Sequence, residues 1–126
     1  MNLITREKAM SILKVNTTVL RNLQKSGKIK ATMLGRNYIY SLESLNKYLH
    51  DNSNGRVKYT DELLSTKEAL RYLNCTANEF RRLCRKYDFA FYRTNEYKSA
   101  KTFYKFEDLK RYKNEFERIK RIKESM

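Results

Sequence analysis

The stretch Leu3-Ile4-Thr5-Arg6-Glu7-Lys8-Ala9-Met10-Ser11-Ile12-Leu13 recurs sixty residues later as Leu63-Leu64-Ser65-Thr66-Lys67-Glu68-Ala69-Leu70-Arg71-Tyr72-Leu73. Three positions are identical, and apolar residues also match at Ile4 and Leu64 and at Met10 and Leu70. The similarity extends to residue 31 and resumes four residues out of step, where Tyr40, Glu43, Leu45 and Tyr48 match Tyr104, Glu107, Leu109 and Tyr112. Because such self-similarity marks a repeated structural unit, the chain is predicted to contain two copies of one unit. The second copy has four extra residues between positions 92 and 103.

Each copy begins with a pattern typical of two short helices. Thr5 and Ser65 are residue types that cap helix N-termini, and apolar residues follow each of them at helical spacing. The pattern breaks at residues 14–16 and 74–76, where Asn16 and Thr76 are again capping types. A second helix is therefore predicted to run to Lys25 or Lys86, after a tight turn.

A hairpin and a closing helix follow. Gly27 suits the left-handed conformation that ends a helix, and residues 29–33 and 38–41 are predicted strands around the turn Gly35-Arg36-Asn37. A third helix is expected over 41–49, and its equivalent in the second copy over 105–123. The predicted fold class is mainly α with small β-hairpin wings, as two tandem units with a long C-terminal helix.

The expected domain boundaries follow from composition. Residues 1–51 form the N-terminal unit, and the polar stretch Asp51-Asn52-Ser53-Asn54-Gly55-Arg56 opens a linker over 52–62. Residues 63–126 form the C-terminal unit with its extended last helix. The apolar residues of that helix fit a coiled-coil dimer seam, but with too few heptads, so packing across the two domains of the same chain is favoured.

Charge points to a polyanionic partner. The 126 residues hold 28 Lys and Arg against 14 Asp and Glu, a net charge of +14. This surplus is spread over the units, with +6 in residues 1–51, +5 in 63–104 and +3 in 105–126. A net charge of roughly 2 to 8 is enough to keep a small domain soluble. We therefore expect both units to meet a nucleic acid.

The predicted order of helix, turn, helix, two-stranded wing and helix is that of a winged helix-turn-helix domain. The first copy resembles the excisionase and MerR-type DNA-binding domains over residues 3–49. The resemblance rests on Ile4-Thr5-Arg6-Glu7-Lys8-Ala9, Leu13-Lys14-Val15-Asn16, Ser26-Gly27-Lys28-Ile29 and Gly35-Arg36-Asn37-Tyr38. The second copy keeps Ser65-Thr66-Lys67-Glu68-Ala69-Leu70 and Phe106-Glu107-Asp108-Leu109 but has Tyr87 in place of Gly27 and a longer wing.

Two such domains in one small basic chain also resemble the TraN-like double-stranded-DNA-binding proteins of Gram-positive conjugative plasmids and their type IV secretion systems. The resemblance implies an accessory or regulatory factor of a mobile element, which binds DNA near a transfer origin or transfer promoter. Relaxase, integrase or other mobile-element proteins are the partners that it implies. An internal pseudo-dimer within a monomer would then bind two half-sites about 10 base pairs apart.

The second helix of each copy is the predicted reader of the major groove, since its apolar residues turn inward and its polar ones outward. The outward residues are Thr17, Thr18, Arg21, Asn22 and Lys25 in the first copy, and Asn78, Arg81, Arg82, Arg85 and Lys86 in the second. Arg21 suits guanine and Asn22 suits adenine, each through two hydrogen bonds. In the wings, Arg36, Asn37, Lys98 and Lys101 are predicted to reach the DNA backbone or a minor groove.

The sequence predicts neither catalysis nor binding of a metal or cofactor. It has one histidine, His50, and its cysteines, Cys75 and Cys84, fit no zinc spacing. The three glycines leave no phosphate-binding loop, so no enzyme activity, cofactor or metal is predicted. Residues 1–13 are too polar for a secretory signal, and no apolar stretch is long enough for a membrane span, so a cytoplasmic protein without membrane contact is expected.

Several functions remain open beside conjugative transfer. An excisionase, or recombination directionality factor, would bend DNA beside an integrase, and a transcriptional repressor would bind over a promoter. A protein-interaction adaptor would use the last helix, and an RNA-binding protein would prefer A-form duplexes or loops.

Overall fold

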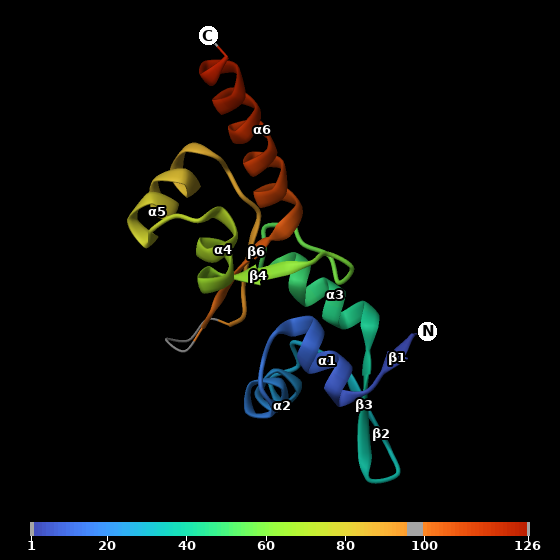
Figure 1. Ribbon diagram of the computed structural model, residues 1–126. Helices are drawn as coiled ribbons and strands as arrows, with labels where there is room; N and C mark the ends of the chain where they lie inside the picture. The colour runs from blue at the N-terminus through green and yellow to red at the C-terminus, as the bar shows by residue number, and fades with distance from the viewer. Residues whose placement is uncertain (1, 96–99, 126) are drawn as a thin grey trace.

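The computed structural model describes residues 2–95 and 100–125, and within them it contains six helices and two three-stranded antiparallel sheets (Figure 1). The first half comprises β1 (Leu3–Ile4), α1 (Arg6–Leu13), α2 (Thr17–Lys25), β2 (Ala31–Leu34), β3 (Asn37–Ser41) and α3 (Leu42–Asp51). The second half comprises β4 (Leu63–Ser65), α4 (Thr66–Leu73), α5 (Ala77–Lys86), β5 (Phe91–Arg93), β6 (Thr102–Lys105) and α6 (Phe106–Glu124). The order of elements is therefore the same in both halves, as the internal repeat predicts.

Local sequence signals explain where the helices start and stop. The Asn16 side chain accepts a hydrogen bond of 2.9 Å from the backbone N–H of Val19, and Ser65 and Thr76 each form a reciprocal capping box with a glutamate. Lys14 and Asn74 end α1 and α4 in the left-handed region, at φ of 56° and 52°. The predicted ends of α2 and α5 at Lys25 and Lys86 are confirmed.

Each half has one strand more than the sequence predicts. The two-residue strand β1 pairs antiparallel with β3, and the three-residue strand β4 pairs with β6, so the sheet orders are β1-β3-β2 and β4-β6-β5. Strands this short show no alternation of polar and apolar residues. The chain is consequently a mixed α/β protein, whereas a mainly α one was expected.

The core of the first half is completed by residues from outside it. Its buried cluster includes Ala9, Leu13, Leu20 and Leu45 from the first unit, but also Val57, Leu63 and Tyr92. A second cluster, around Ala69, Phe80, Phe89 and Leu109, lies within the second half and is rich in aromatic ring contacts. The two halves therefore pack against each other through apolar residues and are not independent units.

Tyr92 on β5 is the centre of the contact between the halves. Its side chain is fully buried, and its hydroxyl donates a 2.9 Å hydrogen bond to the carbonyl of Leu13 at the end of α1. The Tyr48 ring meets it edge-on, with 6.4 Å between the ring centroids, and the Tyr48 hydroxyl donates to the carbonyl of Thr94 at 2.6 Å. The Arg93 backbone N–H donates to the carbonyl of Asn52 at 3.2 Å, so β5 is held against the ends of both α1 and α3.

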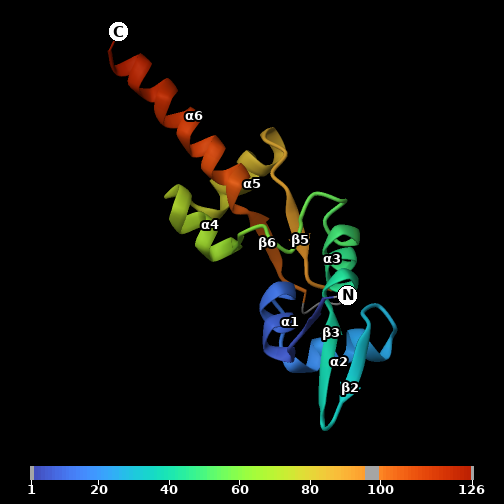
Figure 2. The same ribbon diagram turned by 90° about the vertical axis from the view of Figure 1, so that its right-hand side faces the viewer.

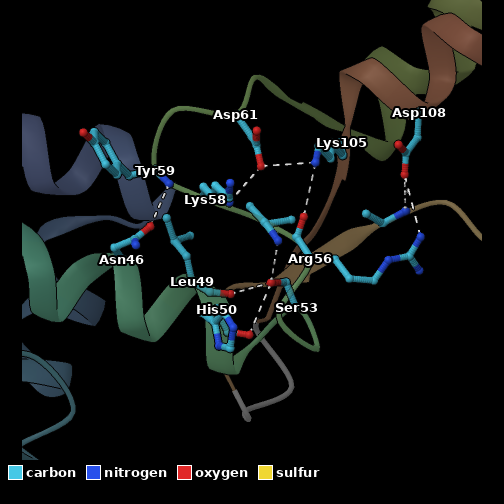
Figure 3. Close-up of polar contacts among 12 residues, drawn as sticks. Asn46, Leu49, His50, Ser53, Arg56, Lys58, Tyr59, Asp61, Lys105 and Asp108 are labelled. Atoms are coloured by element: carbon cyan, nitrogen blue, oxygen red, sulfur yellow. Dashed lines mark hydrogen bonds and ion pairs between the residues drawn. The ribbon is translucent and has the colours of Figure 1, made fainter.

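The segment 52–62, which the sequence identifies as a linker, is packed and hydrogen-bonded (Figure 3). The hydroxyl of the buried Ser53 donates to the carbonyl of Leu49 at 2.7 Å and accepts from the N–H of Val57 at 3.0 Å. The Arg56 guanidinium pairs with Asp88 at 3.0 Å, and Lys105 pairs with Asp61 at 3.6 Å. These contacts tie the segment to the second half, so it fixes the position of one half relative to the other.

Helix α6 packs only partly on the molecule. Leu109 is buried and Tyr112 half-buried against the second half, while the later turns extend away from the body in Figure 1. Phe116, Ile119 and Ile122 are each more than half exposed. The expectation that this helix packs across both domains is therefore wrong, because its apolar stripe continues beyond the surface that the second half offers.

Besides Tyr92, five of the tyrosines are buried or half-buried and contribute to the two cores. Tyr40 and Tyr48 are buried, and Tyr72, Tyr104 and Tyr112 are half-buried. Tyr38 is 41% exposed, because the first hairpin projects beyond the helices that cover the rest of its sheet.

Removing the Tyr92 hydroxyl should destabilise the fold. In Tyr92→Phe the carbonyl of Leu13, one of the unpaired carbonyls of a helix end, loses its buried donor. We expect the free energy of unfolding to fall by about 1 to 3 kcal/mol in denaturant titrations. Tyr38→Phe, at an exposed site, is the matched control and should change it by less than about 0.5 kcal/mol. Equal effects of the two substitutions would contradict the role given to Tyr92.

The same residue predicts a pH dependence. Burial raises the pKa of Tyr92 well above its ordinary value. In the unfolded chain this phenol ionises near pH 10, whereas in the folded chain it stays protonated, so above that pH the unfolded state binds fewer protons. The stability that neutral Tyr92 contributes is thus complete below about pH 10 and falls as the pH rises. The difference in unfolding free energy between the wild type and Tyr92→Phe should therefore be smaller at about pH 11 than at pH 8, and a constant difference would refute the prediction.

Candidate nucleic-acid interface

Helix α2 presents a polar face built on a buried apolar one. Leu20 and Leu23 anchor it in the first core, which turns the other side of the helix to solvent. Of the predicted contact residues on α2, four are exposed: Thr18, Arg21, Asn22 and Lys25. Thr17 is half-buried, and its hydroxyl lies 3.6 Å from the sulfur of Met10, to which it donates.

Helix α5 presents a more strongly basic face. Phe80 is its buried anchor, with Leu83 and Cys84 half-buried beside it. All five predicted contact residues on α5 are exposed: Asn78, Arg81, Arg82, Arg85 and Lys86. The one acidic residue of the helix, Glu79, is engaged in the capping box at its start, where its carboxylate accepts from the N–H of Thr76 at 3.2 Å.

The cations of these two faces have no acidic partner among the residues that the structure describes. Within residues 2–95 and 100–125, none of the ion pairs involves Arg21, Lys25, Arg81, Arg82 or Arg85. The ammonium of Lys86 lies 5.5 Å from the centre of the Tyr87 ring, a cation–π contact that leaves its charge uncompensated. The arginines are thus available to an external anion without breaking an internal salt bridge.

The hairpins place further polar residues at the surface. Arg36 and Asn37 are exposed at the end of the first hairpin, after Gly35, which adopts φ of 65°. In the second hairpin Lys101 is exposed, with its backbone N–H bonded to the hydroxyl of Thr94 at 3.0 Å. Lys98 lies outside the residues that the structure describes.

The second hairpin also comes close to the first unit's candidate helix, a proximity that the sequence does not predict. Asn95, at the end of that hairpin's first arm, lines a pocket together with Asn16, Thr18 and Asn22 of α2. No local pattern relates residue 95 to residue 18. The only available signal is the extra length of the second hairpin, whose destination depends on how the two halves pack.

The two candidate helices lie on the same side of the molecule. In Figure 1 both α2 and α5 are on the left, and in Figure 2, which views the molecule from the right-hand side of Figure 1, both lie toward the back. The two helices that carry the exposed contact residues are therefore on one side of the molecule.

Cys75 lies in the turn between α4 and α5, and Cys84 lies on α5. Cys75 and Cys84 are free and half-buried, and burial raises the pKa of both thiols, which favours the unreactive protonated form.

In the described part of the chain, no helix is both long and apolar enough to cross a membrane.

Comparisons of the chain with family models, with curated proteins and with solved structures found no significant match.

Proposed function

We propose that this chain is a tandem winged helix-turn-helix protein that binds double-stranded DNA, with α2 and α5 as its recognition helices. The observation that carries the proposal is the repetition of one arrangement. In each half, the second helix is anchored by a buried apolar face and exposes arginine that forms no ion pair within the described part of the chain. A chain with net charge +14 gains affinity for a duplex when such cations displace the counterions of phosphates.

The residue types support base reading as well as phosphate binding. Arg21 and Arg81 occupy equivalent repeat positions, and a guanidinium donates two hydrogen bonds to the major-groove edge of guanine. Asn22 matches adenine in the same way. Around them, the remaining lysines and arginines serve the backbone, which positions the protein without selecting a sequence.

The contact between the halves supports binding of one duplex by both helices. Tyr92 and the packed segment 52–62 hold the halves together, and α2 and α5 share one side of the molecule. The preformed pair of helices loses less orientational freedom on binding than two units on a flexible tether, so the second contact adds affinity at little further cost.

The biological context of the proposal is an accessory or regulatory role in conjugative plasmid transfer, with a site near the transfer origin or a transfer promoter. This context rests on the resemblance to excisionase, MerR-type and TraN-like proteins. A selected DNA motif, located beside an origin, an attachment site or a promoter in the DNA around the gene, separates it from the excisionase and repressor alternatives.

Substituting the paired arginines should weaken binding and relax sequence preference. We expect Arg21→Ala and Arg81→Ala each to cost on the order of 1 to 3 kcal/mol in affinity for the selected duplex, because each loses a bidentate base contact. Fluorescence anisotropy with specific and scrambled duplexes measures both effects. Arg118→Ala, an exposed α6 arginine outside this face, removes the same charge and should keep the preference. Unchanged preference in both α2 and α5 variants would exclude these helices as readers.

Affinity should also depend strongly on salt. If the exposed cations bind phosphates, the logarithm of affinity falls with the logarithm of salt concentration, with a slope of about −0.9 for each phosphate contacted. We expect the slope to become shallower by roughly one such contact in Arg85→Ala. Absence of binding to any duplex near 150 mM salt, with binding to RNA hairpins instead, would replace the DNA proposal with an RNA one.

A further inference from the structure

We propose that the two units grip DNA in the same orientation, so that the target is a direct repeat and not an inverted one. The inference rests on the proposed function and concerns the kind of DNA site that the chain recognises. It comes from the contact between the halves, which is one-sided.

The sheet registers establish which residues of the two units are equivalent. Tyr40 and Tyr104 occupy the same position of the repeat, and their partners across the hairpins are Ala31 and Phe91. The next residue along each outer strand is Thr32 in the first unit and Tyr92 in the second. Thr32 is therefore the counterpart of Tyr92.

A two-fold relation between the units would make every contact occur twice. In such an interface, if one copy of a residue touches its partner, the equivalent pair touches as well. Because Tyr92 donates to Leu13, a two-fold relation would bring Thr32 to Leu73, the counterpart of Leu13. Thr32 is instead exposed, and both views place β2 far from α4.

The second contact is equally one-sided. The Tyr48 hydroxyl donates to the carbonyl of Thr94, whose counterpart in the first hairpin, three residues after Ala31, is Leu34. Leu34 is 65% exposed, and the counterpart of Tyr48, Tyr112, packs on Tyr87 and Phe116 of its own half. The halves thus meet head to tail, with different surfaces of the repeated unit in contact.

The pictures show the same relation directly. In both Figure 1 and Figure 2 the two hairpins run downward and the closing helices α3 and α6 run upward. A half-turn about a horizontal axis would reverse these directions, and the one-sided contacts of Tyr92 and Tyr48 exclude a half-turn about the vertical axis. The units are related by a shift along the molecule combined with a turn about its length, since α2 is seen nearly end-on in Figure 1 whereas α5 lies across the view.

The symmetry of the protein determines the symmetry of the site. A two-fold protein binds inverted half-sites, because the operator mirrors the protein's symmetry. Two units related by a shift along one axis and a turn about it, as successive half-sites of a duplex are, bind their half-sites in the same sense, so the half-sites repeat in the same direction. Since Tyr92 and the packed segment 52–62 fix the shift, the spacing of the half-sites is fixed as well.

The half-sites are also predicted to be similar and not identical. Arg21 and Arg81 select a guanine in each half-site. At the next position of the repeat the first unit has Asn22 and the second has Arg82, so the first half-site has adenine where the second has guanine. This difference gives the site a polarity and lets each half be assigned to one unit.

The test uses the full chain and duplexes derived from a random library by repeated selection. The two selected half-sites are rebuilt at the same spacing as a direct repeat, as an inverted repeat and as a single half-site. We expect the direct repeat to bind at least about tenfold more tightly than the other two, because the inverted duplex offers only one half-site in register. Inverted-repeat binding equal to or tighter than direct-repeat binding overturns the inference. Failure to bind any duplex overturns the proposed function itself.

Two further measurements sharpen the assignment. Insertion of about 5 base pairs between the half-sites turns one to the opposite face of the duplex, and should reduce affinity to that of the single half-site. Asn22→Arg should change the preferred base from adenine to guanine in one half-site only. Tolerance of the insertion, or a change of base in both half-sites or in neither, contradicts a fixed head-to-tail pair.

Discussion

The burial of Tyr92 between the two halves is the interaction on which the arrangement of this chain depends. A strand of the second unit inserts its tyrosine against the end of α1, where the hydroxyl satisfies a helix-end carbonyl and the ring completes the first core. Without it, two small units would each have to bury their apolar residues alone, which is marginal at about 50 residues. One side chain thus joins two copies of a repeat into a single body, and thereby sets the direction in which their second helices point.

That arrangement connects the sequence repeat to a function. Duplication alone yields two basic helices, whereas the one-sided contact places both of them on one side of the molecule. The exposed arginines of α2 and α5 form no ion pairs with other described residues. Their guanidinium groups can therefore bind phosphates and base edges without first breaking an internal ion pair. A direct-repeat site and the preference for one spacing follow from the same geometry.

Much of the local structure could be predicted from the sequence, because capping residues, glycine turns and helical spacing act over a few positions. The ends of α2 and α5 and the exposure of their polar faces are of this kind. The short strands β1 and β4 carry no periodic signal, and the approach of Asn95 to α2 depends on the packing of distant segments. The role of Tyr92 could not be predicted either, because its counterpart is the exposed Thr32 and nothing in the repeat marks Tyr92 as a core residue.

The most direct measurement of the central claim is hydroxyl-radical footprinting of the full chain on a selected duplex. The account predicts two protected patches on one face of the DNA, about one helical turn apart. The pattern of protected nucleotides in the first patch should be repeated in the same direction along the duplex in the second. A single protected patch, or two patches arranged as mirror images about a central base pair, would contradict it.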